Sequence, residues 1–199
     1  MTPMRNVGPG ARAVLAVLLA LLAAGCSASR PSADPAATTT AAPTTLDPSV
    51  AAAQYASPTA PASAQMICSD EIRSQVKGAL GLDSTPTPQS AWADHVYTCT
   101  YAVPMGTLVL AVTVAPSVDA AGAQLDALRT QVGAADPEEG FGERAYSAPG
   151  GVLVAVKDNL VLTVDATALP DDLGAGHQRR IDVVRLLAAG VFACWTGAG

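Results

Sequence analysis

The residues best suited to acid–base or metal chemistry in this chain are its two histidines and the aspartates near them. Asp94 directly precedes His95, and the pair could form half of a catalytic dyad in which a carboxylate orients an imidazole. Asp171 and Asp172 precede His177, and these three side chains could gather a metal ion. Both sets fall in polar loops, where solvated side chains are the more common finding. We therefore expect an exposed His95, no metal site and no cofactor.

The sequence lacks the common motifs of enzyme chemistry. Neither histidine belongs to a His-Glu-x-x-His pair, and no Cys-x-x-Cys spacing offers zinc ligands. There is no Gly-x-Ser-x-Gly nucleophile elbow, and the stretch from Gly140 to Gly142 lacks the third glycine of a phosphate-binding loop. We therefore predict no catalytic residues, and we favour a binding protein over an enzyme with dispersed catalytic residues.

Aromatic side chains offer a second kind of site, an apolar ligand pocket. Because the chain has few aromatic residues, the core is the more common place for the same side chains. The residues concerned are Trp92, Tyr97, Tyr101, Tyr146 and Trp195.

The charge balance excludes one class of partner. The chain has 17 acidic and 11 basic residues, a formal net charge of −6, and Arg179-Arg180 is the largest basic cluster in its second half. An acidic surface repels the phosphate backbone, so we expect no binding to nucleic acid.

The N-terminus has the features of an export signal. Arg5 and Arg12 precede an apolar run over residues 13–24, which as a helix would rise roughly 18 Å and is too short to cross a hydrocarbon core of about 30 Å. The run ends in Ala23-Ala24-Gly25-Cys26, which resembles the lipobox of bacterial lipoproteins, with Ala23 where leucine is usual. The resemblance implies cleavage before Cys26 and lipidation of its thiol. An ordinary signal peptide followed by an incidental cysteine is the alternative.

Composition divides the remaining chain into two parts. We assign residues 1–25 to a lipoprotein signal peptide, 26–64 to a disordered linker rich in Ala, Pro, Ser and Thr, and 65–199 to one extracytoplasmic domain. Such a linker is too poor in large apolar residues to form a packed core, and its prolines make it a stiff stalk. Its threonines also resemble those of O-mannosylated actinobacterial linkers, which leaves glycosylation open.

Hydrophobic periodicity predicts an α+β domain. Apolar spacing of three and four predicts helices, alternation predicts strands, and the turn residues between adjacent strands predict hairpins. The expected fold is a largely antiparallel five-stranded sheet with three helices on one face, in the order helix-strand-strand-helix-strand-strand-strand-helix. The helices cover about 69–80, 117–132 and 178–194, and the strands 96–103, 107–115, 144–147, 152–157 and 160–167. The stretch 82–94 is assigned to a loop and Asp158-Asn159 to a hairpin turn. In the last helix, Arg179, Arg180 and Arg185 lie off the apolar stripe, so we expect them on the solvent side.

Short motifs in the domain are similar to those of small, mostly uncharacterised actinobacterial cell-envelope lipoproteins. They are a cysteine that opens the first helix, Cys68, the stretch Cys99-Thr100-Tyr101 on the first predicted strand, and the stretch from Gly142 to Tyr146. The resemblance implies a disulfide between Cys68 and Cys99. Cys194 has no place in that pair, so Cys99–Cys194 and Cys68–Cys194 remain alternatives.

Together these features predict a lipoprotein held at the cell membrane through Cys26 and facing the extracytoplasmic side. We expect a non-enzymatic binding or interaction module, with an unknown envelope protein or an apolar ligand as its partner. An envelope enzyme and a lipid carrier are the alternatives.

Overall fold

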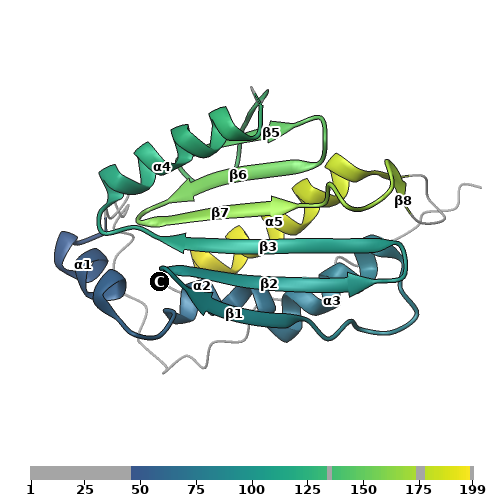
Figure 1. Ribbon diagram of the computed structural model, residues 1–199, viewed down its shortest axis with the longest axis horizontal. Coiled ribbons are helices and arrows are strands. Elements are labelled where there is room, and N and C mark those ends of the chain that lie inside the picture. Colours follow the sequence, from purple (N-terminus) through teal and green to yellow (C-terminus); the bar gives the residue numbers. More distant parts are fainter. Residues whose placement is uncertain (1–45, 134–135, 174–177, 198–199) are drawn as a thin grey trace, which may run out of the picture.

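The computed structural model describes residues 46–133, 136–173 and 178–197, which form an α+β fold around one antiparallel sheet (Figure 1). Seven strands of the described chain lie in the order β1-β2-β3-β7-β6-β5-β4, and every neighbouring pair is antiparallel. Two meanders, β1–β3 and β4–β7, join where β3 pairs with β7. The strands are β1 (Gln89–Ala93), β2 (Val96–Val103), β3 (Gly106–Val114), β4 (Asp136–Glu138), β5 (Arg144–Ala148), β6 (Val152–Lys157) and β7 (Leu160–Asp165).

Helices and a short ribbon complete the described chain. The ribbon pairs β8 with β9 beside the start of the last helix. The remaining elements are α1 (Pro48–Ala56), α2 (Ala62–Gln65), the 3-10 helix η1 (Met66–Cys68), α3 (Asp70–Leu80), α4 (Val118–Gln131), β8 (Asp172–Leu173), β9 (Gln178–Arg179) and α5 (Arg180–Gly197).

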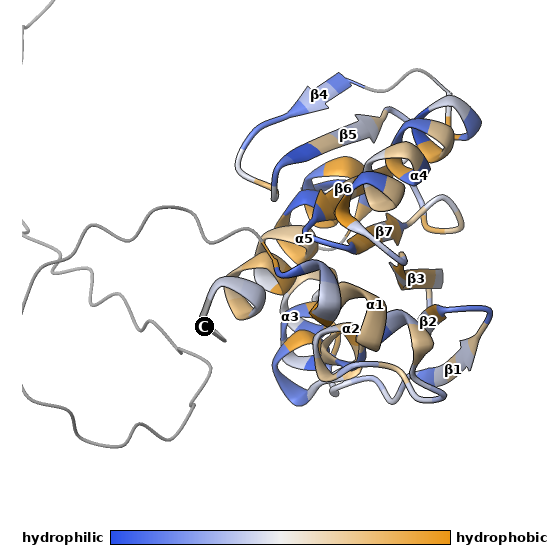
Figure 2. Ribbon diagram, turned by 90° about the vertical axis from the view of Figure 1, so that its left-hand side faces the viewer, coloured by the Kyte–Doolittle hydropathy of each residue, from blue (hydrophilic) through white to orange (hydrophobic). Residues whose placement is uncertain are grey.

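The helices cover both faces of the sheet, which corrects the prediction that all of them lie on one face (Figure 2). Helices α3 and α5 cover one face of the sheet, while α4 packs on β6 and β7 from the other face. The reason is visible in β6 and β7, where neighbours such as Leu153 and Val154 are buried on opposite faces. A strand that is buried on both faces shows no alternation of apolar and polar residues, so its sequence does not indicate on which face a helix packs.

The predicted helix ends are confirmed for α3 and α4. The Ser69 side chain accepts a hydrogen bond from the Ile72 amide, and Gly81 ends α3 in the left-handed conformation at φ 63°. Ser117 caps α4 by accepting from the Ala120 amide. Each cap satisfies a backbone N–H that the first turn leaves without a helical partner.

The sheet has two more strands than predicted, one at each edge. Strand β1 runs through a stretch assigned to a loop, and its outer position leaves four of its five residues exposed. Strand β4 contains Pro137, which an edge strand accommodates because one side of its backbone needs no sheet partner. Half-exposed edge strands carry too little apolar alternation to be detected from the sequence.

The structure also differs from the predicted linker over residues 46–64, which contain α1 and most of α2. Asp47 caps α1, and Ala51, Ala60 and Ala64 are buried. Small alanine side chains allow this segment to approach the domain closely, so it packs without the large apolar residues that the prediction required. Residues 26–45 lie outside the described part of the chain.

The disulfide joins Cys68 and Cys99, as the lipoprotein resemblance implied, with 5.7 Å between their Cα atoms. It fastens η1 to β2. Two strand positions further along, the hydroxyl of Tyr101 donates to the Ile67 carbonyl at 2.7 Å, and burial raises the pKa of this hydroxyl. The 3-10 helix η1, just before α3, is therefore held to the sheet by one covalent bond and one hydrogen bond.

Candidate functional site

The five aromatics that could have lined an apolar pocket do not gather around one cavity. Tyr101 is fully buried in the core beneath α3. Trp92 and Tyr97 are register partners at the β1 edge, partly buried on the same face. Tyr146 lies on the opposite face, where the Arg129 guanidinium stands 4.3 Å from its ring centroid.

Trp195, the fifth aromatic, lies near the end of α5. Its indole N–H donates to the Ser63 carbonyl at 2.8 Å and so ties the last helix to α2. Of the five, it alone lines one of the three hollows described below.

His95 is half-buried, which corrects the expectation of an exposed side chain. Asp94 and His95 form the tight turn between β1 and β2, with φ angles of 51° and 62°. The imidazole stacks on Tyr55 of α1 with 3.8 Å between ring centroids, and Trp92 meets it edge-on at 6.2 Å. His95 therefore helps to fasten α1, a contact invisible while α1 is assigned to a linker.

The three side chains considered as a possible metal site are only partly within the described chain. His177 lies outside it, Asp171 forms an ion pair with Arg180, and Asp172 begins β8. Among the described residues, no group of three or more histidine, cysteine, aspartate or glutamate side chains is arranged to hold a metal ion.

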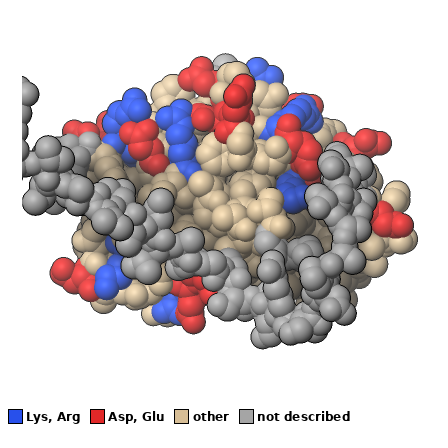
Figure 3. All heavy atoms as spheres, turned by 180° about the vertical axis from the view of Figure 1, so that it is seen from behind, with Lys and Arg blue, Asp and Glu red and all other residues tan. Residues whose placement is uncertain are grey.

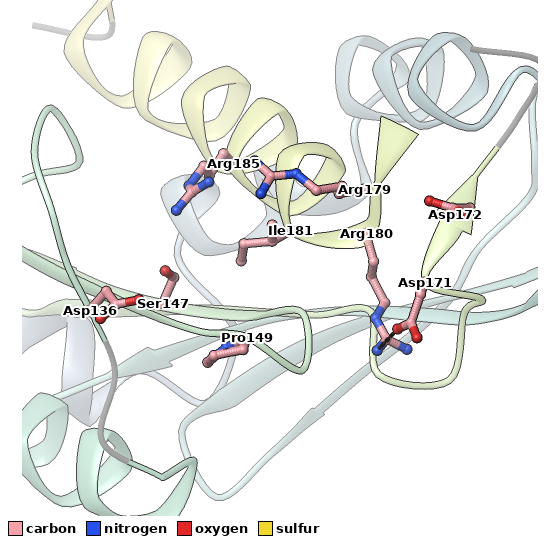
Figure 4. Close-up of a pocket in the computed structure, with 9 residues that line it drawn as sticks. All are labelled: Asp136, Ser147, Pro149, Asp171, Asp172, Arg179, Arg180, Ile181 and Arg185. Carbon is pink, nitrogen blue, oxygen red and sulfur yellow. Dashed lines mark hydrogen bonds and ion pairs between the residues drawn. The ribbon is translucent and has the colours of Figure 1, made fainter. Parts of the chain in front are cut away.

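A charged hollow of about 440 Å³, the arginine pocket, lies between α5, β5 and the β8–β9 ribbon (Figure 4). Arg179 donates to Asp182 at 2.9 Å, Arg185 donates to Glu138 at 2.5 and 3.0 Å, and Arg180 pairs with Asp171. The pocket is lined by Asp136, Ser147, Pro149, Asp171, Asp172, Arg179, Arg180, Ile181 and Arg185.

The charges of the arginine pocket hold the fold together. Burial alone would raise the pKa of Glu138, but hydrogen bonds from Arg185 and Ser147 hold it below its ordinary value. This carboxylate fastens edge strand β4 to α5. Since all three arginines already have acidic partners, the pocket offers little uncompensated positive charge to an anion.

Arg180 corrects a second expectation, because its side chain was assigned to the solvent face. Only 15% of that side chain is exposed. It donates to the carbonyls of Thr167 at 2.9 Å and Leu169 at 2.5 Å, and it lies where a Cβ on Gly151 would stand. The sequence shows two adjacent arginines, Arg179 and Arg180, at the start of a helix. It does not show that Gly151, which has no side chain, leaves room for Arg180.

A hollow of about 400 Å³ lies beside α4. Four of its nine lining residues are acidic, and Arg144 spans it by donating to Asp126 at 2.9 Å and to the Gly122 carbonyl at 3.1 Å. On the opposite face, blue and red side chains lie next to each other rather than in separate patches (Figure 3). The described surface on that face thus presents mixed charge.

The third hollow, the amide pocket, has about 410 Å³ and lies where α1, α2, the β6–β7 turn and the end of α5 meet. These elements occupy the same end of the molecule in Figure 1. The pocket is lined by Leu46, Gln54, Ala62, Ser63, Met66, Lys157, Asp158, Asn159, Leu160 and Trp195.

Two amide side chains distinguish this pocket. Asn159 is 1% exposed, and its Nδ2 donates to the Ala115 carbonyl at 3.0 Å, yet its Oδ1 has no hydrogen-bond partner within the described chain. The buried Oε1 of Gln54 likewise has none there. Both residues belong to the lining of the hollow, so amide groups stand beside its apolar side chains.

Sequence reasoning missed both amides. Asn159 was assigned to a hairpin turn, which is correct, but a turn residue is usually solvated. Gln54 fell in the predicted linker. No sequence signal brings together two residues this far apart in the chain, because their proximity depends on α1 folding back onto the sheet.

A scan against known protein-family models matched none, and searches of curated proteins and of solved structures also found no match. None of the helices in the described ranges combines the length and apolar character needed to cross a membrane. Cys26, the predicted lipidation site, lies outside those ranges.

Proposed function

We propose that this protein is a lipid-anchored, extracytoplasmic binding module whose ligand site is the amide pocket. The observation that carries the proposal is a hollow of about 410 Å³ whose lining combines apolar side chains with the amide side chains of Gln54 and Asn159. Ligand sites are typically apolar hollows with a few polar groups, and their volumes range from about 300 to 1,000 Å³.

The location outside the cytoplasm is supported by two further features. The Cys68–Cys99 disulfide is the kind of bond that persists in oxidising compartments. The sequence at Cys26 resembles a lipobox, and two acyl chains on that cysteine would give stable attachment to a membrane.

The position of the pocket fits a tethered binder. Leu46, at the start of the described chain, lines the pocket itself. A fully extended chain from Cys26 to Leu46 spans at most about 70 Å. The pocket would therefore sample a shell of that depth above the membrane and meet envelope components at raised effective concentration.

Native mass spectrometry of the full chain, extracted in mild detergent from the membranes of cells that make it, tests the proposal. We expect a non-covalent small-molecule adduct on the wild-type protein and a reduced adduct on Gln54→Met. The matched control is Gln75→Met, because Gln75 has an equally buried and unpartnered Oε1 but does not line the amide pocket. An adduct of equal abundance on all three proteins, or none on the wild type, contradicts the proposal.

A further inference from the structure

We infer that helix α1 is a movable wall of the amide pocket and that it opens and closes the pocket by turning about residues 57–59. The inference rests on the proposed binding function and adds the way in which a ligand enters and leaves that site. Three observations lead to it: α1 has few attachments, its docked position buries polar atoms without partners, and the rest of the pocket is fixed without it.

Few contacts attach α1 to the domain. Tyr55 stacks on His95 with 3.8 Å between ring centroids, and Ala51 is the one buried residue of the helix. Val50 is 43% exposed. Among the described residues, no hydrogen bond joins α1 to another helix or strand. An isolated helix of nine residues is marginal in water, so the position of α1 depends on these few contacts.

The docked position of α1 also has an internal cost. Gln54 Oε1 is buried and has no hydrogen-bond partner in the described chain, and neither does Nδ1 of His95, in the ring on which Tyr55 stacks. A polar atom that loses water without gaining a partner destabilises the state that buries it. Gln54 belongs to α1, so its amide regains water when the helix turns outward. The preference for the closed position is therefore small.

The pivot is the segment between α1 and α2. Trp92 donates its indole N–H to the Pro58 carbonyl at 3.1 Å, which holds this segment against β1. Within the segment, the hydroxyl of Ser57 donates to the Thr59 carbonyl at 2.8 Å. Neither of these two bonds reaches into α1, so the helix can turn while the segment stays in place. Hinges are commonly a few residues at the end of an element that absorb the change in backbone angles.

The rest of the pocket is fixed without α1. Trp195 donates to the Ser63 carbonyl at 2.8 Å and ties α5 to α2, and the disulfide of Cys68 ties η1 to β2. In contrast, α1 lies beyond the ends of the strands (Figure 1). An outward turn of α1 carries Leu46 and Gln54 away from the hollow that they line. The motion therefore removes one wall of the pocket and leaves the others in place.

Hydrogen–deuterium exchange of the full chain, followed by mass spectrometry, measures the opening. We expect the amides of α1 to exchange at least about tenfold faster than those of α3, because opening of α1 leaves the core intact. Since a local opening exposes little surface, dilute urea should accelerate exchange in α3 but not in α1. If α1 exchanges as slowly as α3, the helix leaves its position only when the whole domain unfolds, and the inference is wrong.

Methionine oxidation shows whether this motion opens the pocket. Met66 lines the amide pocket, and Met105 lies in the turn between β2 and β3. Both side chains are partly buried, and that turn is at the end of the sheet away from α1 (Figure 1). Hydrogen peroxide converts accessible methionine to its sulfoxide, so Met66 reports on the pocket and Met105 serves as the internal control.

Tyr55→Ala is the variant that should hold the pocket open. Loss of the ring stack should raise the oxidation rate of Met66 about tenfold and leave that of Met105 unchanged. Val50→Ala, a change at an exposed position on the same helix, is the matched control and should leave both rates as in the wild type. Slow exchange of α3 in both variants checks that the domain is folded. Equal oxidation of Met66 in Tyr55→Ala and the wild type contradicts the inference.

The outcomes separate the motion of α1 from the proposed function. If a native adduct is present but the oxidation of Met66 does not respond to Tyr55→Ala, the inference is wrong and the binding function stands. If α1 opens but the wild type carries no adduct, the binding function is wrong, and α1 is a mobile helix rather than the wall of a ligand site. If both hold, the adduct should dissociate faster on dilution from Tyr55→Ala than from Val50→Ala. Equal rates of dissociation would show that the ligand does not pass α1.

Discussion

Single residues in this protein show that the local sequence predicts little of a residue's contacts. Asn159 was predicted as a turn residue and is one, but its importance lies in the Ala115 carbonyl, which holds its amide in one orientation. Arg180 was predicted on the solvent side of a helix, whereas it is largely buried beside Gly151. Periodicity indicates which side of a helix faces the core. It does not reveal that a glycine in a neighbouring turn leaves space for a side chain on the other side.

Gly151 makes this dependence testable. Its φ is +90°, and a Cβ placed on it would stand 2.6 Å from Cγ of Arg180. We predict that Gly151→Ala destabilises the protein by more than about 2 kcal/mol, because it combines backbone strain with displacement of a buried guanidinium. Urea unfolding measures the change as a lower midpoint at an unchanged slope.

The adjacent glycine provides the control. A Cβ on Gly150 would meet nothing within 4 Å, so Gly150→Ala should shift the unfolding free energy by no more than about 0.5 kcal/mol. Equal effects of the two substitutions would show that the close approach of Arg180 does not matter.

At the scale of elements, sequence reasoning succeeded where each element has a local signal. Strands β2, β3, β5, β6 and β7 and helices α3, α4 and α5 follow from alternation, helical spacing and capping residues. Elements α1, β1 and β4 were missed because tertiary contacts hold them: Tyr55 stacks on His95, Trp92 donates to the Pro58 carbonyl at 3.1 Å, and Glu138 binds Arg185. Such contacts become visible only after the chain has folded.

The attachment of β4 should depend on pH. Glu138 has a pKa below its ordinary value of 4.5 in the folded protein, so its ionised form is favoured by folding. The resulting stabilisation is complete above the unfolded-state pKa and is lost as the pH falls through the lower, folded-state pKa. We predict that Glu138→Gln is less stable than the wild type at neutral pH and that the difference shrinks as the solution is acidified below about pH 4.5.

Urea midpoints of both proteins across the acidic range measure this. Glu139→Gln, at the next position and outside the hydrogen bonds with Arg185 and Ser147, is the control and should follow the wild type. A gap between Glu138→Gln and the wild type that stays constant with pH would mean that ionisation of this carboxyl does not stabilise the fold.

For the whole molecule, the division into an exported domain and a preceding tether remains a prediction, while the extent of the folded part is larger than composition indicated. Alanine-rich sequence reads as linker, yet from Leu46 onward it covers one end of the sheet. The implied Cys68–Cys99 bond is present, and Cys194 is buried on α5.

In the proposed lipoprotein, attachment to the membrane depends on a single atom, the sulfur of Cys26. We predict that Cys26→Ala abolishes incorporation of radioactive palmitate and releases the protein from the membrane fraction, because no acyl chain then holds it. The Cys68→Ala/Cys99→Ala variant should remain labelled, since it keeps the lipidation site. Continued labelling of Cys26→Ala would place the lipid elsewhere.

The hydrogen bond between Trp195 and the Ser63 carbonyl also sets the order of events during synthesis. A ribosome releases Gln54 and Ser63 well before Trp195. Segments made early and late thus form two walls of the same pocket. A chain that stops before Trp195 lacks one of these walls, so the cavity cannot form until Trp195 has been made.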